Sequence, residues 1–508
     1  MNRFRACLLP ALLALAACSP RETAVESGNR DQVLHRGVGY EVSGLDPQLA
    51  TGIAEASITS ALFEGLVTED PKDLHPIPGV AAQWDISPDR MTYTFFLRPE
   101  ARWSNTDPVT AQDFVDSWRR ILTPSLGAAY ASSLFVLQGA EAFNKGLTRD
   151  FSQVGAVAVD PHTLRVTLEH PISYFLSLLT TMSWLPVHLS SLAASGPVYE
   201  QHSGWTRPGH LVGNGAFVLR SWEPDRVIVV EKSPTYWDAA HVRLNAIHFY
   251  PIDSLEAEER AFRTGQLHLT DALPLSRIEA YRRDSPQLLR IDPYLDTYFY
   301  RLNVRQPGLS DVRVRRALAL AVDRRAIVER VRRGGQTPAA EFTPPVGGYT
   351  APAYMPTDFA EARRRLAAAG HPGGEGLPPF ELLYNNSESH RLIAEAVQEM
   401  WRKELGVETK LINEEEKVVL AARHSGRYQI LRSNWAADYP EPSSFLDLWR
   451  GDNGNNDTGW SDPEYDSLLF VAARTAGRRP GTPSIARPRR SCSRPPRSSP
   501  FTISRIFF

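Results

Sequence analysis

Short strand-like runs alternate with amphipathic helical runs along most of this 508-residue chain, and this alternation limits the possible folds more than any other feature. Residues 91–97 are rich in Thr, Tyr and Phe, which is typical of a strand. Thr110 stands three residues before Asp113, a pair that predicts a capped helix N-terminus. Residues 312–333 predict one long amphipathic helix with its arginines facing outward. The mixture predicts an α/β protein of several lobes.

The remaining elements follow from the same periodicities. A hairpin is expected over residues 157–168, and Asn214-Gly215 is expected to adopt positive φ angles. Further strands are expected at 32–40, within 211–250, at 298–302 and at 380–384, and further helices at 54–66, 361–369 and 389–405.

Length and composition set the size and class of the protein. A chain this long holds about three domain-sized units, each large enough for a core. Apolar residues make up 42% and charged residues 22%, with a net charge of −2, which is typical of a soluble globular protein without a nucleic-acid partner. The three cysteines are Cys7, Cys18 and Cys492, and the histidines are scattered. We therefore expect no metal site and no cofactor.

The N-terminus predicts export from the cytoplasm. Arg3 and Arg5 precede a short apolar run over residues 8–15, the pattern of a signal peptide. Leu15-Ala-Ala-Cys18 resembles the lipobox of bacterial lipoproteins, which implies lipidation at Cys18; a plain signal peptide that contains a cysteine is the alternative. Residues 19–30 are polar and predict a flexible tether. The folded part is thus expected in the periplasm or cell envelope, anchored to a membrane.

One loop stands out for its chemistry. Asp438 lies between Trp435 and Tyr439, and Pro440 and Pro442 follow. Proline restricts its own φ and the residue before it, so the loop is stiff. Such a loop suits a pocket that holds a cation beside flat surfaces. Alternatively, Asp438 satisfies a turn and the aromatic rings belong to the core.

A series of stretches resembles the bacterial extracellular solute-binding proteins of the oligopeptide and dipeptide class, family 5, which are the capture components of ABC importers. The stretches are Leu62-Phe-Glu-Gly-Leu66, Pro78-Gly-Val-Ala-Ala-Gln-Trp84, residues 92–98, Trp103-Ser, residues 108–114, Asn214-Gly-Ala-Phe217, Pro234-Thr-Tyr-Trp237, residues 311–318 and the loop around Asp438. The likeness covers roughly residues 31–475 and is strongest to the oligopeptide-binding branch.

The resemblance implies an α/β fold of the periplasmic-binding-protein class II type, with two lobes, built from three domains, that close on ligand like a clamshell. After the signal peptide (1–18) and tether (19–30), the implied divisions are a discontinuous domain I (31–63 and 189–292), an inserted domain II (64–188), domain III (293–475) and an aberrant tail (476–508).

The resemblance also implies which residues meet a peptide. Asp438 matches the family carboxylate that pairs with the peptide's α-ammonium group, and main-chain groups near Ile53 and Ala436 would hold an extended backbone. Aromatic residues assigned to the cavity are Tyr130, Tyr294, Trp435 and Tyr439. Tyr130 and Tyr294 have a purely structural alternative as core residues.

Three basic residues match family groups that receive the peptide's C-terminal carboxylate, namely Arg423, Arg432 and His390. Arginine suits this task because its planar fork can bind both carboxylate oxygens. Each also has a structural alternative: Arg423 as a solvated helix residue, Arg432 as the partner of a neighbouring acid, and His390 as a helix cap.

Two stretches depart from the family. Residues 476–508 are rich in Arg, Pro and Ser, contain no Asp, Glu or Lys, and show no helix or strand period. We interpret them as the product of a frameshift near residues 474–478, with a genuine basic, disordered tail as the alternative. Residues 414–417 (Glu-Glu-Glu-Lys) are more acidic than the family pattern, which often has an aromatic there.

The sequence thus predicts a receptor that binds peptides through free N-termini and delivers them to an inner-membrane ABC permease, acting as a monomer without chemistry. Alternatives are the same fold binding murein tripeptide, a nickel chelate, haem or another small solute, or a truncated, non-functional product. A secreted hydrolase is disfavoured because no GxSxG motif or metal-ligand cluster is present.

Overall fold

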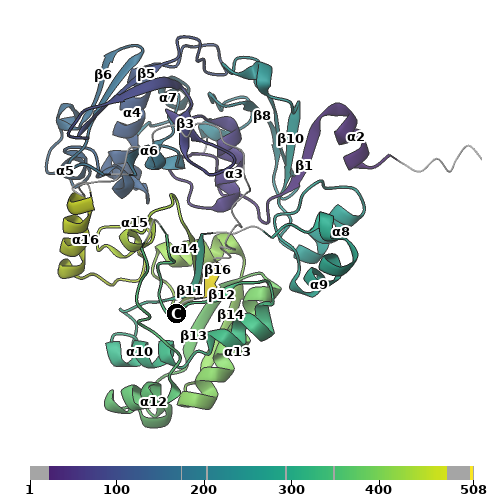
Figure 1. Cartoon of the computed structure of the whole chain (residues 1–508), viewed down its shortest axis with the longest axis vertical. Helices are drawn as coiled ribbons and strands as arrows, with labels where there is room; N and C mark the ends of the chain where they lie inside the picture. The colour runs from purple at the N-terminus through teal and green to yellow at the C-terminus, as the bar shows by residue number, and fades with distance from the viewer. Residues whose placement is uncertain are drawn as a thin grey trace, which may run out of the picture.

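The chain folds into two lobes, shown one above the other in Figure 1. The computed structural model describes residues 22–172, 174–201, 204–291, 295–346, 349–476 and 504–506. One large apolar core runs through the upper lobe, from Val38 to Phe249, and a separate one fills the lower lobe, from Tyr298 to Ile430. Two cores mean that each lobe can move as a unit.

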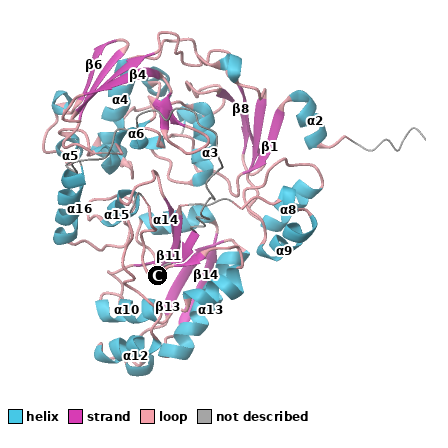
Figure 2. Cartoon of the chain, in the orientation of Figure 1, coloured by secondary structure: helices cyan, strands magenta, loops and turns pink. Residues whose placement is uncertain are grey.

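The upper lobe contains two four-stranded sheets (Figure 2). The first has the order β1-β10-β9-β8, with β1 at Val33–Gly37, β8 at Phe217–Glu223, β9 at Val227–Lys232 and β10 at Ala246–Tyr250. The second has the order β4-β5-β7-β6, with β4 at Ala81–Ile86, β5 at Thr92–Leu97, β6 at Ala156–Asp160 and β7 at Thr163–Thr167. A small pair joins β2 (Val67–Glu69) to β3 (Pro76–Pro78).

The first sheet shows that the chain leaves this region and returns. β1 pairs in parallel with β10, although more than 200 residues lie between Val33 and its partner Ala246. The second sheet is formed within that interval.

The lower lobe is organised around one mixed sheet of order β12-β16-β11-β15-β13-β14. Its strands are β11 (Asp296–Leu302), β12 (Thr337–Pro338), β13 (Phe380–Asn385), β14 (Thr409–Glu414), β15 (Ile430–Ala436) and β16 (Ser504–Ile506). β15 runs antiparallel to β11, with Trp435 opposite Thr297. The C-terminal end of β15 therefore leads directly into the Asp438 loop.

Helices cover the sheets of both lobes (Figure 2). Their bounds are α2 Ala24–Asp31, α3 Ile53–Leu62, α4 Ala111–Leu122, α5 Ala140–Asn144, α6 Phe175–Leu178, α7 Leu189–Ser195, α8 Leu255–Arg263, α9 Leu275–Asp284, α10 Val312–Leu320, α11 Arg324–Ala326, α12 Phe359–Ala368, α13 Glu388–Leu405, α14 Glu416–His424, α15 Ser443–Leu446 and α16 Pro463–Ala476.

Most elements predicted from sequence periodicity are confirmed. The capping box of Thr110 and Asp113 opens α4. The hairpin over 157–168 is β6 and β7, and the strands at 91–97, 298–302 and 380–384 are β5, β11 and β13.

The single long helix predicted over residues 312–333 is wrong. α10 ends at Leu320, and Asp323 then caps a new start by accepting a hydrogen bond from the backbone N–H of Ala326. Residues Ile327–Arg332 follow as a π-helix, whose wider turn rotates the side chains away from the α-helical pattern.

Two local predictions are also wrong. Thr23 and Glu26 form a capping box that starts α2, so the predicted flexible tether is an ordered helix from Ala24 onward. Gly215 does not adopt a positive φ angle. A Cβ there would lie 2.6 Å from the carbonyl carbon of Leu62, so glycine is needed for close backbone approach.

Apart from Ser504–Ile506, the tail from residue 477 onward lies outside the described residues. Strand β16 adds to the lower sheet in parallel with β11 and β12. Among the described residues, no helix has the length and apolar character needed to cross a membrane.

Candidate functional site

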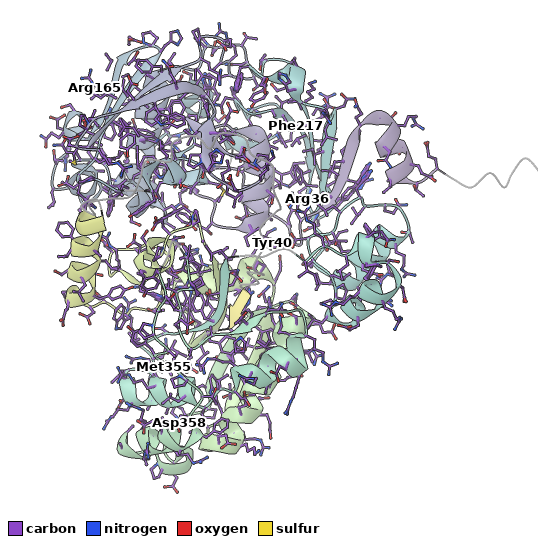
Figure 3. All side chains as sticks on the ribbon, viewed as in Figure 1. Arg36, Tyr40, Arg165, Phe217, Met355 and Asp358 are labelled. Atoms are coloured by element: carbon purple, nitrogen blue, oxygen red, sulfur yellow. The ribbon has the colours of Figure 1, made fainter. Side chains whose placement is uncertain are left out.

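A cavity of about 1170 Å³ lies where the two lobes meet. The upper lobe contributes the start of α3 and the segment around Tyr130, and the lower lobe contributes β15, the Asp438 loop and α13. Tyr40, which also lines the cavity, is labelled near the junction of the lobes in Figure 3. This volume exceeds the usual range for small-molecule pockets, so the cavity suits a larger, extended ligand.

The cavity gathers most of the residues singled out in the sequence. Those that line it are Ile53, Tyr130, His390, Arg423, Arg432, Trp435, Ala436 and Asp438. Tyr439 does not line it, and its ring stacks on Tyr174 with centroids 4.9 Å apart. Tyr294 and Cys18 lie outside the described residues. Residues from four distant parts of the chain thus meet in one place.

The Asp438 loop is held by hydrogen bonds to Ser444. The backbone N–H of Asp438 donates to Ser444 Oγ at 2.8 Å, and Trp435 Nε1 donates to the Ser444 carbonyl at 2.6 Å. These bonds and the two following prolines fix where the carboxylate points. Trp435 also stacks on Tyr130 of the upper lobe, with ring centroids 6.3 Å apart.

The Asp438 carboxyl group is largely enclosed and has no counter-charge among the described residues. Among the described residues it forms no ion pair, and part of its side chain opens to the cavity. Burial raises its pKa to about 7, from an ordinary value of 3.8. A buried charge is costly unless it is paired, so this position favours a cation in the cavity.

A second group of charges lies around Arg432. Its guanidinium sits 4.9 Å from the centre of the Tyr298 ring, and its Nη1 donates to Asn385 Oδ1 at 3.4 Å. Within the part of the chain that the structure describes, Arg432 forms no ion pair, so the structural alternative of a neighbouring acid is wrong.

His390 lies beside these arginines and is not a cap. Ser387 occupies the N-cap position of α13 and His390 lies within the helix, so the capping alternative for His390 is wrong. Burial, together with Arg432 and Arg332, holds the pKa of His390 well below its usual value. The ring is therefore neutral at neutral pH, rather than the positive group expected from the sequence.

Arg423 is already compensated. Its Nε lies 3.1 Å from Asp457 Oδ2, and both side chains are largely buried. The alternative of a solvated helix residue is wrong, because only 13% of the Arg423 side chain is exposed. Of the two arginines expected to receive a carboxylate, only Arg432 forms no ion pair among the described residues, although Asp296 and Glu416 lie near enough for its charge to lower their pKa values.

The sequence reasoning missed Arg332. It lines the cavity from the π-helix, and its Nη1 donates to Ser389 Oγ at 2.6 Å. Burial and the nearby Arg432 lower its pKa, whereas Tyr298 and the nearby acid Asp296 raise it. No ion pair to Arg332 is formed within the part of the chain that the structure describes. The expected continuous helix placed all its arginines outward; Asp323, a capping residue within that stretch, was the signal for the break.

Glu416, from the unusually acidic stretch, also lines the cavity. Burial raises its pKa, and Glu55 and Asp253 raise it further, whereas Arg432 and Arg423 lower it. No ion pair or hydrogen bond to its carboxylate occurs within the described ranges. This side of the cavity is therefore acidic.

A possible cation cluster elsewhere does not belong to the cavity. Asp70, Asp73 and His75 bring ligand-type atoms within 4.8 Å of one another. None of the three lines the cavity, and the His75 and Asp73 side chains are more than half exposed. The cluster therefore has no part in the site.

Comparison with the sequences of known proteins identifies the family that the motifs of this chain resemble. The family model "Bacterial extracellular solute-binding proteins, family 5 Middle" matches residues 75–457. The periplasmic oligopeptide-binding protein OppA of Escherichia coli (strain K12) is 38% identical over 477 residues, which cover 91% of this chain and 85% of that protein. The periplasmic murein peptide-binding protein MppA of the same strain is 36% identical over 451 residues, which cover 87% and 82%.

Comparison with solved structures gives the same fold and a difference in lobe arrangement. The murein tripeptide-binding protein MppA of Escherichia coli has a TM-score of 0.83 and 36% identity, with 87% of each chain covered. MppA in an unliganded open form has a TM-score of only 0.57 at the same identity, with 88% and 86% covered. Because the sequences are equally similar, the lobes here are arranged unlike the open form.

Proposed function

The chain belongs to the bacterial extracellular solute-binding proteins of family 5, and from this premise we infer that it captures oligopeptides outside the cytoplasmic membrane for an ABC importer. The family is one of solute-binding proteins, so no catalytic step is required of the site. The ligand would lie in the cavity between the lobes, and closure of the lobes would enclose it.

The observation that carries this proposal is the unpaired Asp438 carboxylate. A free peptide N-terminus is an ammonium group, and it supplies both the opposite charge and three hydrogen-bond donors. Trp435 and Tyr130 form the walls beside it. An N-acetylated peptide would leave the carboxylate unpaired, so the site would discriminate between the two.

The other end of the peptide would meet Arg432 and Arg332. Both guanidinium groups lack a carboxylate partner among the described residues, and both line the cavity. Arginine forks bind carboxylates in a bidentate manner. Neutral His390 would act as a hydrogen-bond donor there. Between the two ends, main-chain groups near Ile53 and Ala436 would hold the extended backbone.

The finer points of the proposal concern the setting of the receptor. The protein would act as a monomer, lipid-anchored through Cys18 in the periplasm, and would deliver its ligand to an inner-membrane permease. We place domain II at 64–188, inserted in domain I, and domain III from 293. Domain I would begin near Ala24, since α2 is part of the folded lobe.

Murein tripeptide is the second candidate ligand. The similarity to a murein peptide-binding protein favours it, and such a peptide carries additional charged groups that the arginines and Glu416 would meet. Both candidate ligands would supply an ammonium group that pairs with the Asp438 carboxylate.

Calorimetric titration with trialanine, N-acetyl-trialanine and a murein tripeptide tests the proposal. Trialanine should bind, and its N-acetylated form should bind at least tenfold more weakly. Binding of neither peptide would refute a peptide receptor, and equal binding of both would refute the role of Asp438. Much tighter binding of the murein tripeptide would favour the second candidate.

A further inference from the structure

Three histidines cluster at the β1 edge of the first sheet of the upper lobe. His35 on β1 lies opposite His248 on β10, with ring centroids 4.8 Å apart. His268 stacks on His35 at 5.5 Å with an angle of only 7° between the rings. His35 is 93% buried, since only 7% of its surface is exposed. None of the three histidines lines the cavity.

One hydrogen bond of the cluster requires a neutral His268 ring. The backbone N–H of His35 donates to His268 Nδ1 at 3.0 Å, so this nitrogen must carry a lone pair. In return the backbone N–H of His268 donates to the His35 carbonyl at 2.8 Å. Nδ1 of His35 lies 2.9 Å from the hydroxyl of Tyr250. Protonation of His268 would remove an acceptor on which a strand N–H depends.

Helix α2 lies beside β1 (Figure 1), and its Gly28 approaches the histidine cluster closely. Gly28 is the contact point: a Cβ there would lie 2.8 Å from His268 Cε1, 3.0 Å from His35 Cδ2 and 2.6 Å from the Val33 carbonyl oxygen. The start of the helix is also tied down, because the N–H of Val25 donates to the Gly265 carbonyl at 2.9 Å. The imidazoles thus form the surface on which α2 rests.

Charged groups near the cluster do little to stabilise protonated rings. Glu231 on β9 favours a charged His248, and Arg226 lies near Tyr250. On α2, Glu26 caps its own helix, and Arg30 pairs with Asp31 and Glu22 at the exposed side. No set of nitrogens from the three imidazoles converges closely enough to hold a metal ion within the described residues.

We propose that α2 is a pH-sensitive latch, docked on the His35–His248–His268 cluster when the imidazoles are neutral and released when they are protonated. This goes beyond ligand capture and does not depend on it. Protonation would place like charges against one another in a stack and break the bond from the His35 N–H. If the eight residues of α2 were released and fully extended, they would span at most roughly 29 Å between the upper lobe and the chain that precedes α2.

The direction of the pH effect follows from the shifts. Burial lowers the pKa of His35 to about 4, from an ordinary 6.5, and burial also lowers the pKa of His248. A lowered pKa means that docking is favoured above pH 6.5 and is lost as the pH falls towards 4. If undocking restores the ordinary value, His35 alone raises the undocked-to-docked ratio about 30-fold between pH 8 and pH 5.

Hydrogen exchange on the full chain, corrected for the intrinsic rate at each pH, tests the latch. Amides of Ala24–Asp31 should lose at least tenfold of their protection between pH 8 and pH 5, while those of α13 stay protected. Unchanged protection of α2 in the wild-type protein at pH 5 would overturn the proposal. Equal loss in α13 would also overturn it, because global acid unfolding would then be the cause.

Two sets of variants separate the cluster from other acid effects. His35→Asn with His268→Asn keeps an acceptor near each Nδ1 but cannot be protonated, so α2 should stay protected at pH 5. If that pair does not fold, His268→Asn alone decides. Gly28→Ala should release α2 even at pH 8, whereas the matched Gly44→Ala, with nothing within 4 Å of its added Cβ, should not. Release at pH 5 in the asparagine variant, or a docked α2 in Gly28→Ala, contradicts the proposal.

Discussion

The raised pKa of Asp438 makes ligand affinity depend on pH in a calculable way. In the empty cavity the carboxyl has a pKa of about 7. A bound ammonium group would favour the ionised form and lower that pKa, so binding releases a proton wherever Asp438 was protonated. With the bound pKa below 5, the affinity falls by a factor of 1 + 10^(7−pH) relative to its maximum. Affinity for trialanine should therefore drop about 50-fold between pH 7 and pH 5.

At higher pH a different group limits binding. The peptide's α-amino group loses its proton near pH 8, so the affinity should pass through a maximum between about pH 7 and pH 8. Calorimetry across pH 5–9, in buffers of different ionisation enthalpy, measures both the affinity and the protons released. One proton per peptide should be released near pH 6.

Asp438→Asn removes the titrating group and the charge. This variant should flatten the acid limb of the profile and weaken binding at pH 7.5 by about 2–4 kcal/mol, or roughly 30- to 1000-fold. N-acetyl-trialanine is the matched control ligand, since its weak affinity should not fall below pH 7 in the wild-type protein. An acid limb that persists in Asp438→Asn, or a wild-type change below threefold from pH 7 to pH 5, would show that Asp438 does not bind the amine.

Three further outcomes are expected. Glu416→Gln should reduce the affinity for lysine-containing peptides at least threefold relative to trialanine in competition titrations, because it removes a cavity carboxylate that forms no ion pair among the described residues; an unchanged ratio would contradict this. Arg332→Met should weaken trialanine more than trialanine amide, since only the former carries the carboxylate the guanidinium would bind; equal losses would argue for a structural role. Gly215→Ala should destabilise the protein by about 1–3 kcal/mol in urea unfolding, because its Cβ would lie 2.6 Å from the Leu62 carbonyl carbon; a variant as stable as wild type would mean that the backbone adjusts freely.

Local capping signals were sufficient to find several elements, and the two main errors came from signals that were present but not used. Thr23 and Glu26 have the same capping-box spacing as Thr110 and Asp113, yet the polar composition around them suggested a tether. Asp323 lies inside an apparently regular helical pattern and caps a second start there. In both cases the hydrogen bonds that cap the first helical turn determine where the helix starts, whatever the overall polarity or periodicity of the surrounding residues.

The candidate site could be located from sequence, but its charge state could not. The stiff loop predicted the position of Asp438 because prolines act locally. Whether an arginine forms an ion pair depends on partners distant in the chain: Arg423 pairs with Asp457, 34 positions away, while Arg432 forms no ion pair within the described ranges. His390 is neutral because it is buried and because two arginines from other elements lie beside it. Such compensation is a property of the assembled fold.

The uncompensated charges also bear on why the lobes close. Tyr130 of the upper lobe stacks on Trp435, and Tyr174 stacks on Tyr439, so closure covers both sides of the Asp438 loop with aromatic surface. These contacts favour closure, whereas enclosing an ionised Asp438 opposes it by about 4 kcal/mol, because its pKa rises from 3.8 to about 7 and one pKa unit corresponds to about 1.4 kcal/mol. The two effects have similar size, since each aromatic pair adds about 1 kcal/mol to the apolar area it buries. A ligand cation removes the cost of enclosing the ionised Asp438 and leaves the aromatic contacts unchanged. Peptide binding would therefore shift the lobes towards the closed arrangement without any new contact between them, and Asp438 would couple recognition of the N-terminus to closure.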